Sequence, residues 1–131
     1  MRRFIRNHGK LTAFLILACS LAGMVGWDLS ASIRGQLVAR FDVGRGHYEV
    51  LMVGLPVEWR PEYVRLLRER HGIEDRVVAG CIVSRSLSAY VEGYNGVSMR
   101  AANHKFGHDV FRESAVDASR HWELLHSRSF Q

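Results

Sequence analysis

Residues 48–55 read YEVLMVGL, a short run of β-branched and large apolar side chains bounded by turn-forming residues. Such a run predicts a buried strand, which Pro56 ends because proline cannot continue a ladder of backbone hydrogen bonds. Residues 76–83, RVVAGCIV, have the same character and predict a second buried strand, with Gly80 as its weak point. The folded part of the chain is therefore expected to contain at least two strands.

The segment between these strands predicts a helix over residues 61–71. Pro61 stands at a favoured first helical position, and Gly72 follows the last residue, as is common at helix ends. Val64 and Leu67 share one apolar face of this helix. A strand, a helix and a strand in this order predict a parallel βαβ unit with a right-handed crossover.

Two further helices are expected after the second strand. From Ser84, a typical helix cap, apolar residues recur on one helical face until about Gly107. The dipeptide Asn95-Gly96 is also typical of hairpins, so a strand pair is the alternative there. Residues 109–125 carry the clearest helical stripe of the chain.

The fold class that follows is α/β or α+β, with one βαβ unit and two C-terminal helices packed over it. A sheet of two strands is only marginally stable on its own. We therefore expect either a third strand from residues 37–43 or pairing with a partner. No internal repeat or low-complexity segment is present.

The N-terminal residues 1–27 predict a membrane or signal helix. The run from Leu11 to Trp27 is uncharged and lies at the short end of what can span about 30 Å of hydrocarbon as a helix. Basic residues that precede an apolar run stay in the cytoplasm, so the chain after Trp27 is expected in the periplasm of a bacterial-type cell. The preceding basic residues are Arg2, Arg3, Arg6 and Lys10.

Three fates of this leader are compatible with the sequence. An uncleaved anchor in the inner membrane is favoured because the apolar run continues through residues 24–27, beyond a typical signal-peptide core. Ser20 and Ala22 have the spacing that a signal peptidase reads, so a secreted protein is an alternative. Cys19 ends a loose lipobox, and a lipoprotein is the third alternative.

The chain is divided accordingly into a leader (1–27), a stalk or linker (28–46) and a small α/β domain (47–131). Within the stalk, apolar residues recur every four positions and predict a helix that continues outward from the membrane. Gly35 weakens this prediction, and the glycines at 44 and 46 favour a turn at the boundary. The recurring apolar residues are Leu29, Ile33, Leu37 and Phe41.

Charge argues against a nucleic-acid partner. The chain has 18 basic and 13 acidic residues, a formal net charge of +5. Four of the basic residues belong to the leader, and no acid precedes Asp28, so the part from Asp28 onward has 14 basic residues against 13 acidic ones. A nearly neutral domain lacks the basic surface that phosphate backbones require.

Cys81 is the one thiol outside the leader, so no disulfide can form within the domain. It lies near the end of the second predicted strand and before a helix, a position at which a thiol can become reactive. Its apolar neighbours favour a buried, inert cysteine instead, and an intermolecular disulfide is a third alternative.

His104 and His108 are four residues apart, the spacing that can bring two imidazoles to one metal ion on a helix. Asp109 and His121 are conceivable further ligands. Gly107 lies between the two histidines and is expected to end the helix, so the rings should not converge. We expect no metal and no cofactor.

An aromatic and amide-rich segment offers a possible ligand cleft, because pockets combine aromatic walls with a few polar groups. Packing in the core is favoured over this cleft, since tyrosine at helical spacing usually buries its ring. The residues concerned are Tyr90, Tyr94, Asn95, Asn103 and Phe106.

The usual catalytic signatures are absent: the sequence has no GxSxG, GxxxxGK[ST], GxGxxG or HExxH. The expected function is a membrane-attached, extracytoplasmic interaction or assembly module without catalytic activity, which binds a protein partner or a second copy of itself. A small envelope enzyme or redox protein that uses Cys81 is one alternative, and a small-ligand-binding domain is another.

Overall fold

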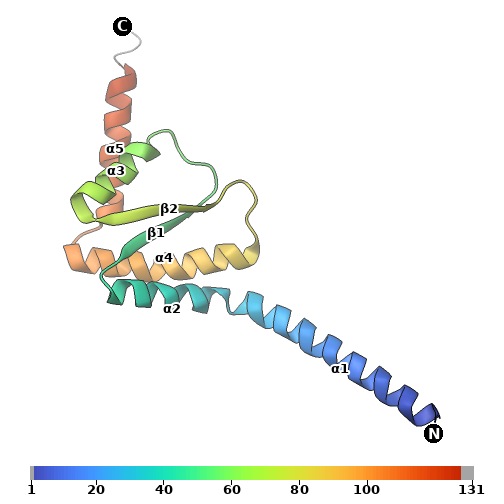
Figure 1. Ribbon diagram of the computed structural model, residues 1–131. Coiled ribbons are helices and arrows are strands. Elements are labelled where there is room, and N and C mark those ends of the chain that lie inside the picture. Colours follow the sequence, from blue (N-terminus) through green and yellow to red (C-terminus); the bar gives the residue numbers. More distant parts are fainter. Residues whose placement is uncertain (1, 128–131) are drawn as a thin grey trace.

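The computed structural model of the protein describes residues 2–127 (Figure 1). Five helices and two strands follow one another in this part of the chain. They are α1 (Arg2–Leu29), α2 (Ala31–Gly44), β1 (Tyr48–Val53), α3 (Arg60–His71), β2 (Ile73–Ala79), α4 (Arg85–Phe106) and α5 (Val110–Ser127). The mixed helix and strand composition confirms the predicted fold class.

Strands β1 and β2 pair in parallel, with Tyr48 opposite Ile73 and Met52 opposite Val77. This pairing, with α3 between the strands in sequence, confirms the predicted βαβ unit. The bounds of β2 were predicted wrongly, because the strand ends at Ala79 and starts before residue 76. The left-handed conformation of Gly72, at φ 64°, ends α3 and lets the chain enter β2 at once.

The helices after β2 form largely as predicted. The Ser84 hydroxyl accepts a hydrogen bond from the Leu87 amide at 3.1 Å and caps α4. Helix α4 runs without a break through Gly93 and Gly96, so the hairpin alternative was wrong. The additional strand at residues 37–43 was also wrong, because this segment lies within α2.

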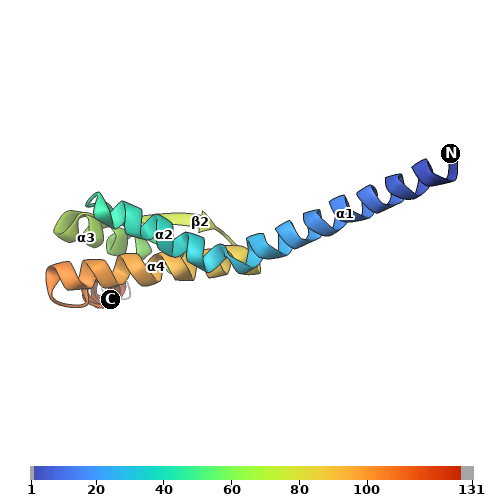
Figure 2. The same cartoon turned by 90° about the horizontal axis from the view of Figure 1, so that it is seen from below.

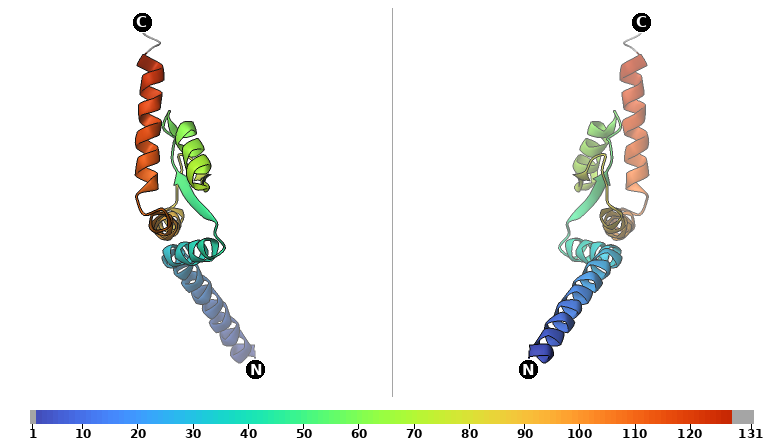
Figure 3. Two further views of the ribbon diagram at one scale, coloured as in Figure 1. Left: turned by 90° about the vertical axis from the view of Figure 1, so that its left-hand side faces the viewer. Right: turned by 90° about the vertical axis from the view of Figure 1, so that its right-hand side faces the viewer.

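The sheet is covered on both faces, since successive side chains of a strand point in opposite directions. One cluster of buried side chains joins the sheet to α3, to α5 and to the C-terminal part of α4; α3 and α5 stand next to each other (Figure 3). A second cluster joins the sheet to α2 and α4. The first contains Val50, Leu67, Ile73, Ala102, Val110 and Phe111, and the second contains Ala39, Leu51, Val91 and Tyr94.

Helix α2 belongs to the folded domain, whereas the segment 28–46 was expected as a stalk. Helices α2 and α4 lie side by side along their length (Figures 1 and 2). Gly35 faces the backbone of Tyr90, and Gly93 faces the backbone of Ser32, so that neither position has room for a Cβ atom. The glycine that weakened the helix prediction is thus the residue that lets α2 pack closely.

Candidate functional site

Helix α1 projects away from the domain (Figures 1 and 3). Between Phe14 and Trp27, eight large apolar side chains are each at least 54% exposed. A surface of this kind is rare on a protein that is surrounded by water alone. The eight are Phe14, Leu15, Ile16, Leu17, Leu21, Met24, Val25 and Trp27.

The apolar surface continues onto the outer face of α2. Ile33, Leu37 and Phe41 are 59%, 56% and 61% exposed, while Ala31 and Ala39 on the opposite face are fully buried. The exposed residues recur every four positions, so they form one stripe along the helix. Helix α2 therefore has two apolar faces: small residues face α4, and large ones face outward.

Arg34 fixes the joint between α1 and α2. Its guanidinium lies 3.7 Å from the centroid of the Trp27 ring and donates a hydrogen bond of 2.8 Å to the Trp27 carbonyl oxygen. The two helices meet at an angle of 54°. Within residues 2–127, no single helix has the length and hydropathy of a membrane span, but Phe14–Asp28 and Ala31–Gly44 satisfy both conditions when they are taken together.

A buried carboxylate lies under the sheet on the α4 side. Glu49 is 6% exposed. Its carboxylate forms an ion pair with Arg76 of the neighbouring strand, at a distance of 2.6 Å. The Tyr94 hydroxyl lies 2.8 Å from Asp42 Oδ2 and 3.4 Å from Glu49 Oε2. Burial is the main factor that raises the pKa of Tyr94, and the two nearby carboxylates raise it further. The phenol therefore stays protonated and remains a hydrogen-bond donor.

The one group of possible metal ligands among the described residues comprises His47, Glu49 and Glu74, whose ligand atoms lie within 4.8 Å of one another. No local sequence pattern indicates this group, because the pairing of the two strands brings Glu49 and Glu74 together. Arg76 already neutralises Glu49. This ion pair joins the two strands.

The free edge of β1 is covered by side chains of α4. The Asn95 side chain accepts a hydrogen bond from the Leu51 amide and donates one to the Leu51 carbonyl oxygen, each at 2.8 Å. Ser98 donates a bond of 2.7 Å to the Glu49 carbonyl oxygen. Among residues 2–127, no side chain forms such hydrogen bonds to the backbone of β2. The outer edge of β2 is therefore free.

The aromatic and amide residues that were proposed to line a ligand cleft pack or form hydrogen bonds within the fold. Tyr94 is 1% exposed in the core, and the Tyr90 ring stacks on it with a centroid distance of 6.4 Å. The Asn103 side chain accepts a hydrogen bond of 3.2 Å from the Val110 amide and so joins α4 to α5. Phe106 packs against the first core cluster, next to His71. Ligand binding by these residues stays a prediction.

Cys81 lies in the loop between β2 and α4, and its side chain is exposed. The expectation of a buried cysteine was wrong, because β2 ends before Gly80 and the apolar neighbours do not enter the core. Ile82, for example, is 92% exposed. No histidine is hydrogen-bonded to this thiol among the described contacts, and a reactive role for Cys81 stays a prediction.

The histidines proposed as metal ligands do not form a common site in the described part of the chain. His104 is exposed near the end of α4, whereas the His108 ring lies in the following turn, where its Nε2 is 2.9 Å from Glu113. His121 is 3.0 Å from Glu62 of α3. Asp109 caps α5 by accepting a bond from a backbone amide.

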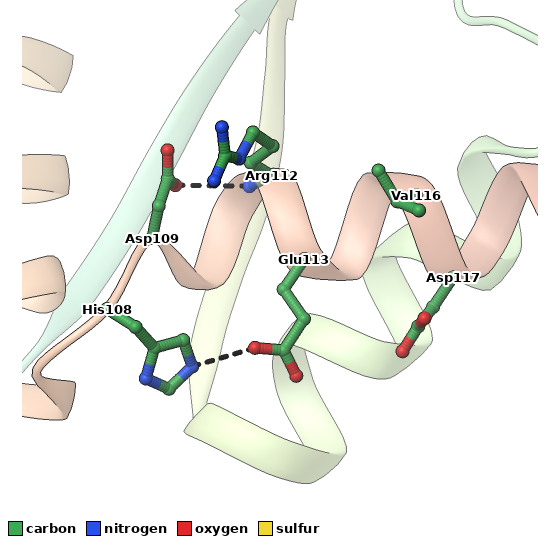
Figure 4. A pocket seen from close by; sticks show the side chains of 6 residues that line it. All are labelled: His108, Asp109, Arg112, Glu113, Val116 and Asp117. Atoms are coloured by element: carbon green, nitrogen blue, oxygen red, sulfur yellow. Dashed lines mark hydrogen bonds and ion pairs between the residues drawn. The ribbon is translucent and has the colours of Figure 1, made fainter.

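A surface hollow of about 260 Å³ lies along the start of α5 (Figure 4). The His108 and Glu113 side chains meet at one side of it, while the Asp109 carboxylate points to the other. His108 is paired with Glu113, the Asp109 carboxylate with the Arg112 amide, and Asp117 with Arg70 of α3. This hollow is a solvated helix surface. Arg112, Val116 and Asp117 complete its lining.

No protein-family model, no curated protein and no solved structure matches this chain.

Proposed function

We propose that the chain is a membrane-attached, extracytoplasmic interaction and assembly module. In this proposal α1 enters the inner membrane with its N-terminus in the cytoplasm, and the α/β domain lies on the periplasmic side. The observation that carries the proposal is the exposed apolar surface that runs from Phe14 along α1 and onto the outer face of α2. The basic residues that precede it support the orientation.

Helix α2 has a distinct place in this proposal. The bend of 54° turns α2 away from the direction of α1, and its exposed stripe of Ile33, Leu37 and Phe41 then lies along the bilayer surface. Arg40 and Arg45 are exposed on the same helix and its end, where they can meet anionic headgroups. The domain would thus be held close to the membrane by two helices.

The assembly partner that we propose is a second copy of the chain, paired through the free edge of β2. An open strand edge favours addition of another strand, and a sheet of two strands gains stability from it. Glu74 and Arg76 are exposed on either side of Asp75. In an antiparallel pair of copies centred on Asp75, each Glu74 would lie opposite the other copy's Arg76, which favours pairing.

Membrane attachment is tested by a pair of reporters fused after Gln131, one active only in the periplasm and one only in the cytoplasm. We expect activity from the periplasmic reporter alone and full recovery of the chain in the carbonate-washed membrane fraction. Activity of the cytoplasmic reporter, or an unprocessed chain in the soluble fraction, would contradict the proposal.

Assembly is tested by the molar mass of the detergent-solubilised chain from light scattering. The wild type should be a dimer, and Glu74→Arg should be a monomer because like charges would then face each other across the edge. Glu123→Arg, on the exposed surface of α5, is the matched control and should stay a dimer. A monomeric wild type, or a Glu74→Arg variant that remains dimeric, would refute pairing through β2.

A further inference from the structure

A cavity that is partly open to solvent lies on the other side of the sheet from the Glu49 network. It has a volume of about 190 Å³ and lies between the sheet, the first turns of α3 and the side of α5. Val50 and Met52 of β1 and Trp59, just before α3, form much of its apolar wall. Ala115 contributes the wall from α5.

Two charged residues also line this cavity. Asp75 of β2 and Arg60 of α3 form an ion pair, with their side chains 0% and 12% exposed. The pair uses only part of their hydrogen-bonding capacity: Oδ2 of Asp75 and Nε of Arg60 are buried and have no partner. A buried donor or acceptor that is left unpaired is costly, on the order of 1–3 kcal/mol each. Both unpaired atoms belong to residues of the same cavity wall.

The chemistry of the wall defines what would fit. The ion pair is neutral as a whole, so a charged ligand would bring an uncompensated charge into a buried site, which is unfavourable. Oδ2 needs a donor and the Nε–H group needs an acceptor. A primary amide supplies one of each, and a hydroxyl group can do the same. The apolar remainder of the wall favours an aromatic or branched aliphatic body.

The size of the cavity sets the limit on that body. An apolar cavity of about 150 Å³ holds a benzene molecule, so about 190 Å³ accommodates one ring with a small polar substituent. We infer that this cavity is a binding site for a small, neutral molecule that has an apolar body and one amide or hydroxyl head, with the head on the Asp75–Arg60 pair. This inference does not depend on membrane attachment or on assembly.

An access route is present beside the loop before α3. Val57 and Arg60 line the cavity on one side and an outer hollow of about 440 Å³ on the other. Val57 itself is 47% exposed. A ligand would therefore reach the cavity past the side chains of this loop rather than through the sheet.

Benzamide is a suitable probe, and Trp59 reports on its binding. In a Trp27→Phe/Trp122→Phe variant of the full-length chain, Trp59 is the remaining tryptophan. We expect benzamide to change its fluorescence saturably, with a dissociation constant in the millimolar range or tighter, and benzoate and benzylamine to bind at least about tenfold more weakly. Protein-free detergent micelles serve as the blank.

Three substitutions test whether the ligand binds in the cavity. Ala115→Leu should fill the cavity and abolish the benzamide response, while Val116→Leu, the exposed neighbour on α5, should leave it unchanged. Asp75→Asn should weaken benzamide at least about tenfold but leave the binding of benzene unaffected, because only the head group loses its partner. Thermal unfolding of each variant confirms that it is folded.

Several outcomes would overturn the inference. One is the absence of a saturable response, which would mean that the cavity holds water only. Another is equal binding to the wild type and the Ala115→Leu variant, which would place the ligand elsewhere. A third is equal affinity for benzamide and benzoate, which would show that the Asp75–Arg60 pair does not select the head group.

Discussion

The contact between α2 and α4 gives the sharpest test of the packing, through the substitution Gly93→Ala. A Cβ atom at this position would overlap the carbonyl oxygen of Ser32 and lie 2.9 Å from its carbonyl carbon. These atoms belong to the backbone of α2, so rotation of a side chain cannot relieve the overlap. Helix α2 would have to move away from α4 and leave part of the second core cluster open.

The expected magnitude combines two opposing effects. Overpacking costs about 1–3 kcal/mol, and the upper end applies here because two helix backbones collide. Alanine in place of glycine stabilises a helix by about 1 kcal/mol. We therefore expect the free energy of unfolding to fall by about 2 kcal/mol, which corresponds to a decrease of about 10 °C in Tm for a domain of this size.

The assay is thermal unfolding followed by circular dichroism, with Gly96→Ala as the matched control. Gly96 lies in the same helix, but its added Cβ would meet only the Arg100 guanidinium, at 3.5 Å. This variant should gain about 1 kcal/mol from helix propensity alone. The reasoning would be refuted if Gly93→Ala were as stable as the wild type, or if both variants changed stability in the same direction.

Two further predictions concern polar groups in the domain. Asn95→Ala should lower the free energy of unfolding by about 2–3 kcal/mol, because the Leu51 amide and carbonyl lose their hydrogen-bond partners. Urea denaturation measures this loss. A loss under about 0.5 kcal/mol would contradict the prediction and mean that water replaces the side chain. Burial lowers the pKa of His71 below 6.5, so the unfolded chain takes up a proton there first as the pH falls. Stability should therefore decrease as the pH drops below 6.5, and His71→Leu should reduce this dependence; an unchanged pH profile would contradict the assignment.

Much of the fold was accessible from local patterns. Three local signals act within a few residues, and each predicted its element correctly. They are the apolar run at β1, the residues Pro61 and Gly72 at the two ends of α3, and the Ser84 cap of α4. The start of β2 was missed because Ile73–Arg76 includes three charged residues, which obscured the strand. These side chains are placed by partners that the sequence does not reveal: Asp75 pairs with Arg60, and Arg76 with Glu49.

The candidate sites depended more on tertiary structure. Gly35 looked like a helix breaker, but it is the position at which α4 approaches α2, a contact between segments far apart in the chain. The Asn95 amide covers the free edge of β1, a role that the spacing of residues along α4 does not indicate. The cavity beside Asp75 combines residues from both strands and two helices, so no local pattern could have indicated it.

The two native cysteines allow the most direct test of the proposed arrangement. Cys81 is exposed on the domain, and Cys19 lies in the apolar part of α1. In intact spheroplasts, a membrane-impermeant maleimide should label the wild type and the Cys19→Ser variant, but not Cys81→Ser, because the bilayer shields Cys19. Labelling of Cys81 only after the spheroplasts are lysed would place the domain in the cytoplasm and contradict the account.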